Sequence, residues 1–512
     1  MNQPQPRVVE PLAIVKNVWH VILGFTLLRL VLAAILPLTP QEAYYWSWSL
    51  DLDWSYFDHP PLASYSIALT TVLLGHSIFA VKLAAVIWWV GLNVLWARLI
   101  LDMFRDQRLA FWSLIALNLT IVYELYGFVI SPDTPLVFAW VATTWAVWRL
   151  CQTGDYRWWY AAGFFMGLAW LGKYTGVLLV PSILLFFLLS RRQRHWLATP
   201  HPYLASLLAV VVFTPVLIWN AQHEWVSFAF QGSRRTGGMH SFRPRFFVEL
   251  IGSQLFMLSP YFLVMVVGRF VRSLRQRDRL KDDDRLLLLF FSGGLTLLFF
   301  TLVSFRTLVK MNWLAVAYWP FIILGVRHVL QRKRGWRRFQ IGLVSAGLFL
   351  ALGLSVVTLP NVPLGDGNTW SGWRTAAQKV ERLKAGLEAE GERTFVFSTN
   401  YKVASLLRFY MDGNPRTYAQ DIFARPALQF DYWELTKPLA DRTGILVVDD
   451  RREYRFRPER IEPHFNRINH VDSLIIEGFG QQTRRIDFYL CRDYAGHPRQ
   501  LGSNNLKEKT HE

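Results

Sequence analysis

The sequence is poor in charged residues and in cysteine. Only 18% of its 512 residues are Asp, Glu, Lys or Arg, whereas 52% are hydrophobic and 15% are aromatic. This composition excludes an ordinary soluble protein and is typical of a polytopic membrane protein. The two cysteines, Cys151 and Cys491, lie far apart in the chain and on opposite sides of the membrane in the topology predicted below, so no disulfide between them is expected.

Several motifs that mark common enzyme classes are also missing. We find no internal repeat along the chain, and the region after residue 360 has neither a glycine-rich phosphate loop nor a Cys or His cluster with metal spacing. Acidic residues number 37 against 55 basic ones, which gives a net charge of +18. In a soluble protein this charge would suggest nucleic acid. Here the basic residues cluster in short segments between apolar runs, so they indicate membrane topology and no nucleic-acid partner.

Eleven apolar segments are predicted to span the membrane, because each approaches the roughly 20 residues that a bilayer requires. They are 18–38, 78–104, 109–127, 134–150, 158–172, 176–190, 203–220, 246–268, 286–304, 313–327 and 341–359. The first is predicted to be a retained anchor, since no small-residue cleavage site follows it. Segment 62–75 is short and begins after a proline, so we predict a re-entrant or surface helix inside the first outer loop, 39–77.

The basic residues predict the orientation of these spans. Short cytoplasmic loops are enriched in Lys and Arg. Segments 269–285 and 327–338 carry seven and six basic residues, and an odd number of spans with the N-terminus inside puts both in the cytoplasm. The sequence therefore predicts a multi-pass membrane protein whose C-terminal region is extracytoplasmic.

After Pro360 the apolar runs shorten, charge rises, and helical patterns alternate with strand patterns. We predict helices at 375–390 and 403–411 and strands at 394–398 and 444–448. This alternation is typical of a small α/β layer fold. The predicted domains are thus a transmembrane catalytic domain, 1–359, and an extracytoplasmic α/β domain, 360–512.

Unusual polar residues gather on the predicted outer face. They are Glu42, Asp58, His59, Asp133, Lys173, Tyr174, Arg234, Arg235, Lys310 and Asn312. Ionisable groups at span ends tend to line a wet cavity and to mark function, and this mixture combines acids that suit a hard divalent cation with bases that suit a phosphate. Local alternatives remain open: Asp133 in SPDTP fits the N-cap of the next helix, and His59 fits a simple turn residue.

The order of these motifs resembles a known family. The segments EAYYW at 42–46, FDHPP at 57–61, SPDTP at 131–135, LGKYTG at 171–176, WNAQHEW at 219–225 and KMNW at 310–313 resemble the polyprenyl-phosphate-dependent glycosyltransferases of the membrane-embedded C-type fold. More narrowly, the chain resembles the bacterial relatives of the protein O-mannosyltransferases, in the wider group that includes the lipid A aminoarabinose transferases. The resemblance covers about residues 18–330.

The resemblance implies a polytopic C-type fold and an inverting transfer of sugar from a polyprenyl-phosphate donor. It places catalysis at Glu42, Asp58, His59 and Asp133. In the family an acidic pair opens the first outer loop, but here its first position is Gln41, so either Glu42 or Asp58 is expected to be the base. A Mg²⁺ or Mn²⁺ ion at Glu42 and Asp133 is possible. The residues expected to bind the donor phosphate are Lys173, Tyr174, Arg234, Arg235, Lys310 and Asn312.

Two other functions fit parts of the sequence. A lipid or glycolipid transporter is favoured by Arg29 and Arg98, which lie inside predicted spans, although the chain lacks the internal symmetry common in transporters. A non-catalytic assembly protein would use the C-terminal domain to bind a partner. If the chain is a transferase, its acceptor can be lipid A, another envelope glycan or a protein, because the sequence does not discriminate among them.

Overall fold

The computed structural model describes residues 12–236, 242–332, 335–359, 370–419, 427–433, 439, 442–451, 461 and 464–494. The chain forms two compact units. Unit 1 comprises Met1–Ile35 and Asp53–Ser355, and unit 2 comprises Leu36–Leu52 and Val356–Glu512. The described part of the first outer loop is therefore shared between the two units, whereas the sequence placed all of it in the transmembrane domain.

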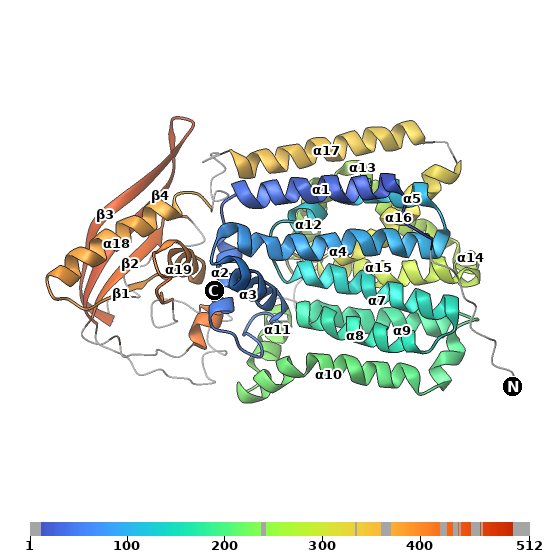
Figure 1. Cartoon of the computed structure of the whole chain (residues 1–512), viewed down its shortest axis with the longest axis horizontal. Coiled ribbons are helices and arrows are strands. Elements are labelled where there is room, and N and C mark those ends of the chain that lie inside the picture. The colour runs from blue at the N-terminus through green and yellow to red at the C-terminus, as the bar shows by residue number, and fades with distance from the viewer. Residues whose placement is uncertain are drawn as a thin grey trace. The chain divides into compact units, whose positions relative to one another are not determined.

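Unit 1 is a bundle of helices, most of which lie side by side (Figure 1). Its helices are α1 (Lys16–Ile35), α3 (Leu62–Leu74), α4 (Ile78–Phe104), α5 (Gln107–Asn118), α6 (Ile121–Leu125), α7 (Asp133–Thr153), α8 (Arg157–Gly172), α9 (Leu179–Leu189), α10 (His201–Gln222), α11 (Val226–Thr236), α12 (Pro244–Leu258), α13 (Pro260–Arg275), α14 (Arg277–Asp282), α15 (Asp284–Val303), α16 (Ala315–Arg332) and α17 (Trp336–Thr358). Among the described residues, α1, α4, α10, α15 and α17 are long and apolar enough to cross a membrane, and the bent pair α12 and α13 would make a sixth span. The count of eleven stays a prediction.

Two of the predicted spans are broken. Segment 109–127 forms two helices, because α5 ends at Asn118 and α6 begins only at Ile121. Segment 246–268 is divided between α12 and α13, which are bent by 113° at Ser259. Pro260 explains this bend, since proline lacks an N–H and disfavours helical geometry in the residue before it. Segment 62–75 forms the 13-residue helix α3, which is too short to span a bilayer unaided.

Small residues let the helices of unit 1 approach closely. Gly163 and Gly167 lie four residues apart on α8 and face α10. A Cβ atom added at Gly163 would lie 2.2 Å from the carbonyl oxygen of Ala205, and one at Gly167 would lie 2.7 Å from that of Ala209. Such small residues at a spacing of four are typical of helix pairs packed by van der Waals contact inside a bilayer.

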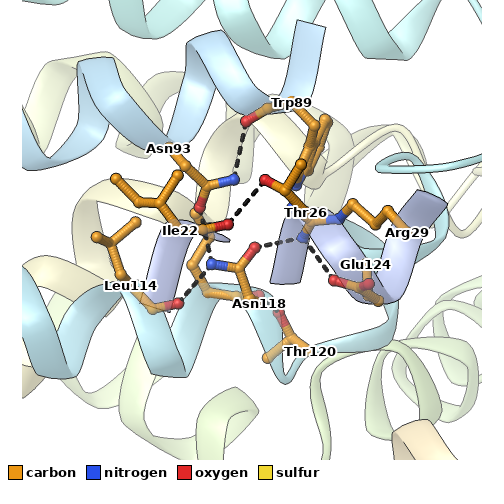
Figure 2. Close-up of polar contacts among 10 residues, drawn as sticks. Ile22, Thr26, Arg29, Trp89, Asn93, Leu114, Asn118, Thr120 and Glu124 are labelled. Carbon is orange, nitrogen blue, oxygen red and sulfur yellow. Dashed lines mark hydrogen bonds and ion pairs between the residues drawn. The ribbon is translucent and has the colours of Figure 1, made fainter. Parts of the chain in front are cut away.

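A buried polar network joins α1, α4, α5 and α6 (Figure 2). Arg29 forms an ion pair with Glu124, and both side chains are inaccessible to solvent. Arg29 also donates to the side-chain oxygen of Asn118, and the Asn118 amide donates to Asn93 at 2.8 Å. Asn93 in turn donates to the carbonyl oxygen of Trp89 at 2.8 Å. The charge of Arg29 is thus neutralised within the protein.

In its described residues, unit 2 contains a four-stranded sheet, three α-helices and a short 3-10 helix, Leu428–Asp431. Its elements are α2 (Pro40–Leu50), α18 (Trp373–Ala389), β1 (Thr394–Phe397), α19 (Tyr401–Tyr410), β2 (Thr443–Asp449), β3 (Phe465–Gly478) and β4 (Gln481–Tyr494). The strand order is β1-β2-β4-β3, with β1 parallel to β2 and the other pairs antiparallel. The two helices and two strands predicted after residue 370 are all present. The β3–β4 hairpin was not predicted. The domain boundary predicted at residue 360 lies outside the described residues.

The predicted outer loop begins with a helix, α2. Thr39 caps α2 through a capping box, in which its hydroxyl accepts from the Glu42 N–H at 3.2 Å and the Glu42 carboxylate accepts from the Thr39 N–H at 3.0 Å. The aromatic face of α2 packs on α19, where Trp46 meets Phe409 edge to face at 4.8 Å. The aromatic residues of EAYYW are therefore buried within unit 2.

Candidate functional site

Three polar side chains from separate loops of unit 1 meet at one point. The ammonium of Lys173 lies 2.9 Å from both carboxylate oxygens of Asp133. The side-chain amide of Asn312 donates to the same carboxylate at 2.7 Å. Asp133 and Lys173 are almost completely buried, with side-chain exposures of 6% and 7%. The sequence placed all three residues on one face of the membrane, and the structure brings them into contact.

Local structure explains how each side chain reaches this point. Asp133 is the first residue of α7, after the N-cap Pro132, so the predicted N-cap role of Asp133 is wrong. The carboxylate instead stands in the first helical turn, where the helix dipole favours negative charge. Lys173 ends α8 in an extended conformation, with φ of −160°, and a short 3-10 helix, Tyr174–Leu178, follows it. The chain leaves the helix abruptly at Lys173 and points its side chain back to α7.

The FDHPP turn and the residues before it are held by the end of α10 and by α11. Near the end of α10, the indole of Trp219 donates to the carboxylate of Asp53 at 2.7 Å, and Trp219 is stacked on His223 with ring centres 3.9 Å apart. On α11, Gln231 donates to the carbonyl oxygen of Asp58 at 2.8 Å. Trp219 of the WNAQHEW motif thus contacts the segment before the turn, and Gln231 holds the backbone of the turn itself.

Tyr174 follows Lys173 directly and lies within electrostatic range of Asp58 in the turn. Its side chain is buried next to Lys173 in the sequence, and burial raises the pKa of Tyr174, while neighbouring polar groups of Ser227, Asn220 and Ser55 oppose that rise. The negative charge of Asp58 raises the pKa of Tyr174 further. The phenol therefore remains protonated at neutral pH and can donate a hydrogen bond. Asp58, Tyr174 and the Asp133–Lys173–Asn312 cluster form the candidate site of unit 1.

Other predicted site residues are placed differently. Glu42 belongs to unit 2 and serves the capping box of α2. Lys310 is exposed and stands two residues before Asn312. Arg234 and Arg235 end helix α11, but their side chains lie outside the described part of the structure. Half-buried His59 follows Asp58 in the turn.

The residues as placed do not form a divalent-metal site. Both oxygens of Asp133 are already engaged by Lys173 and Asn312. Within the described ranges, no three His, Cys, Asp or Glu side chains come together in an arrangement that could hold a metal ion. A Mg²⁺ or Mn²⁺ ion stays a prediction, and no step proposed below depends on it.

One buried charged residue of unit 1 was not singled out from the sequence. Lys82 lies in the first turns of α4, is 1% exposed, and has its ammonium 5.9 Å from the centre of the Phe128 ring. A single lysine near the start of a 27-residue apolar helix is the signal that could have identified it, because a charge buried at membrane depth is costly unless it has a role.

The charges that favoured a transporter are neutralised within the protein. Arg29 pairs with Glu124, and Arg98 pairs with Asp102 at 2.7 Å. A cavity of about 630 Å³ lies where the end of α4 meets the start of α15. Among the acids that line it, Asp284 accepts from Ser190 at 2.6 Å and from Gln193 at 3.1 Å. These carboxylates are satisfied by side chains of the protein, as expected for structural groups.

Known proteins resemble this chain in sequence. Residues 58–219 match the family described as dolichyl-phosphate-mannose-protein mannosyltransferase. The chain is 25% identical over 438 residues to the lipid A galacturonosyltransferase RgtD of Rhizobium johnstonii, and the match covers 84% of this chain and 90% of that protein.

Solved structures share the fold. The chain superposes on ArnT from Cupriavidus metallidurans in the apo state with a TM-score of 0.58 and 14% identity, covering 94% of this chain and 99% of the other. The TM-score is 0.61, again at 14% identity, for the same protein bound to undecaprenyl phosphate, with 95% and 100% of the two chains covered. At this identity the likeness shows the fold alone.

Proposed function

Because the chain belongs to the superfamily of polyprenyl-phosphate-sugar glycosyltransferases with the C-type membrane fold, we propose that it transfers a sugar from an undecaprenyl-type phosphate to lipid A. The main structural support is the convergence of Asp133, Lys173 and Asn312 from three loops. The likeness to a lipid A galacturonosyltransferase supports lipid A as the acceptor and a hexuronic acid as the first sugar to test.

In the proposed reaction, a lipid A hydroxyl attacks the anomeric carbon of the donor from the face opposite to the phosphate. The new C–O bond forms as the bond between the anomeric carbon and the phosphate oxygen breaks, so the configuration inverts. The hydroxyl proton passes to a carboxylate, either Asp58 or Glu42, and the polyprenyl phosphate leaves with the bonding electrons. A positioned general base contributes about 10²–10⁴-fold to such a step.

Lys173 is the proposed partner of the leaving phosphate. An ammonium has three N–H donors, and two of them are directed at the oxygens of Asp133. The third can reach a phosphate oxygen, where negative charge grows during the reaction. Asp133 acts through Lys173 and is a positioning residue, and Asn312 holds the carboxylate from the other side. Tyr174 adds a neutral hydrogen-bond donor.

We further propose that this site opens on the extracytoplasmic face of the inner membrane. The distribution of basic residues supports this orientation, because the loops at the other ends of the helices carry the Arg-rich segments 269–285 and 327–338. A donor headgroup would then meet lipid A on the same face.

The direct test is transfer by the purified full-length chain in proteoliposomes that contain lipid A and an undecaprenyl-phosphate sugar. Mass spectrometry of the lipid A should show the mass increment of one sugar, and the anomeric configuration by NMR should be opposite to that of the donor. Offering uronic acid, aminopentose and neutral hexose donors in parallel identifies the sugar. Transfer to protein or to another glycan, with none to lipid A, would contradict the proposed acceptor. Retention of configuration would contradict the mechanism.

A further inference from the structure

Helix α13 leaves the direction of α12 and packs against two other helices. The bend between α12 and α13 is 113°. The rings of Tyr261 and Phe262 at the start of α13 each lie 6.4 Å from Phe339 of α17. Further along, Met265 meets Gly325 of α16, where an added Cβ atom would lie 2.4 Å from the Met265 sulfur. Side chains of α13 therefore contact both α16 and α17.

Basic side chains gather where these three helices meet. This basic cluster consists of Arg269 and Arg272 on α13, His328 and Arg332 on α16, and Arg338 on α17. The two arginines of α13 follow Met265 by four and seven residues, and the two basic residues of α16 follow Gly325 by three and seven. The helical repeat thus returns each of them to the face that carries the contact. Arg338 precedes Gly342, which packs under the Tyr261 ring, by one turn.

Electrostatic effects confirm that these groups act on one another. Burial and the positive charges of the three arginines on α13 and α16 lower the pKa of His328, which follows the predicted span 313–327, to about 4. The charges of Arg269 and Arg338 both act on the hydroxyl of Tyr261. His328 is consequently neutral at pH 7, and the cluster carries four positive charges.

The cluster has no matching negative charge in the described part of unit 1. No carboxylate is among the groups that act on Arg269 or His328, and none of the four arginines forms an ion pair with a described residue. Other arginines of unit 1 differ in this respect: Arg285 pairs with Asp283 at 2.9 Å and Arg98 with Asp102 at 2.7 Å. Four like charges beside a low-dielectric membrane repel one another, so the arrangement favours an external anion.

The helices that carry the basic cluster also have exposed apolar side chains. On α13, Val264 is 71% exposed, and Val267 and Leu274 are each 44% exposed. On α17, Ile341 and Val344 are 60% and 64% exposed. These side chains are spaced by three, seven or ten residues along each helix, so they form apolar stripes that suit contact with acyl chains.

We propose that the basic cluster binds the phosphate headgroup of an anionic phospholipid of the bilayer, whose acyl chains lie along the apolar stripes of α13 and α17. Basic pockets between membrane helices on the cytoplasmic side are suited to such headgroups, and the positive-inside rule puts this end of the bundle there. The bound phosphate neutralises the repulsion among the arginines and holds the broken helix α13 against α16 and α17. The site is independent of the proposed transfer reaction.

The test compares two double variants that remove the same charge from the same two helices. Arg269→Gln with Arg338→Gln acts on the cluster. Arg275→Gln with Arg337→Gln is the matched control, because these residues lie on the same two helices but outside the cluster. The full-length protein is placed in phosphatidylcholine nanodiscs with increasing phosphatidylglycerol, and the phosphatidylglycerol retained after transfer to detergent is counted by native mass spectrometry. Retention should fall about tenfold or more in the cluster variant and less than about twofold in the control.

Two further measurements separate lipid binding from other causes. Arg269→Lys with Arg338→Lys keeps the charges and should retain the lipid, which would show that the loss in the glutamine variant is not a failure to fold. Inorganic phosphate added to the protein in pure phosphatidylcholine nanodiscs should raise the unfolding temperature less than phosphatidylglycerol included in the nanodiscs does. Equal losses of lipid in the two glutamine variants would overturn the proposal. Protection by inorganic phosphate equal to that by the lipid would show a free-anion site and would overturn the lipid assignment.

Discussion

Replacing Arg29 with methionine leaves a carboxylate buried inside unit 1 without its cation. The partner, Glu124, is completely buried, and Asn118 loses the donor to its side-chain oxygen at the same time (Figure 2). Removing one member of a buried ion pair costs about 3–5 kcal/mol. We expect the free energy of unfolding to fall by that amount in Arg29→Met and by a similar amount in Glu124→Gln.

The double variant Arg29→Met with Glu124→Met should lose much less free energy of unfolding than the sum of the two single losses. The pair is incompletely satisfied, since the Arg29 Nε and Nη1 atoms and the Glu124 Oε1 atom are buried without a hydrogen-bond partner. The attraction within such a pair barely exceeds the free energy needed to desolvate its two charges. Replacing the whole pair with apolar residues is therefore often neutral or stabilising. We expect the double variant to lie within about 1–2 kcal/mol of the wild type.

Unfolding in mixed micelles with increasing sodium dodecyl sulfate, followed by tryptophan fluorescence, measures these differences. Arg285→Met is the control, because its ion pair with Asp283 is partly exposed, with side-chain exposures of 40% and 24%. Exposed pairs contribute about 0–1 kcal/mol, so this variant should change little. The reasoning fails if Arg29→Met costs no more than the control, or if the two single losses add in the double variant.

Four other results are expected. Glu42→Gln should lower turnover by about two orders of magnitude without loss of stability, since glutamine also fits the capping box. Glu42→Ala should lower both turnover and stability. Full activity in Glu42→Gln with none in Asp58→Asn would assign the base to Asp58. Lys173→Met should weaken binding of the lipid-phosphate donor. Arg306 is an exposed cation on the segment that carries Asn312, and Arg306→Met should leave donor binding unchanged. Unchanged donor binding in both variants would mean that the phosphate site lies elsewhere. Alkaline phosphatase fused after residue 512 should be active, and a fluorescent cytoplasmic reporter there should be dark; the reverse pattern would refute the extracytoplasmic C-terminus. Burial raises the pKa of Cys491 to about 12, so at pH 8 its thiolate fraction is roughly 1000-fold below that of an ordinary thiol. Maleimide should therefore label Cys491 only after unfolding. Rapid labelling of the native protein would show that β4 is not packed as described.

Local sequence was sufficient wherever one element buries its own apolar pattern. The long apolar run that forms α4 and the amphipathic run that forms α18 were predicted to within a few residues, because their periodicity alone dictates a helix. The strands β1 and β2 were found for the same reason, since they are short, apolar and bounded by turn residues. The β3–β4 hairpin was missed because its exposed face carries many charged residues, as in the run QQTRRIDFYLCRDY, and only pairing with β2 reveals the buried face.

The order of the motifs, and the side of the membrane on which each lies, were also predicted from the sequence. This prediction placed Asp133, Lys173 and Asn312 on one face of the membrane. The direct contact of these three residues could not be predicted, because it depends on how α7, α8 and the turn before α16 pack. Lys173 lies 40 positions from Asp133 in the sequence and Asn312 lies 179 positions from it, so no local pattern indicates that they are close. Tertiary structure likewise turned the aromatic segment 40–50 into a helix that packs on α19, and bent the predicted span 246–268 at Ser259. The physical reason is the same in each case: hydrophobic pattern determines which elements form and which faces are buried, whereas the partner that buries each face is selected by packing across the whole chain.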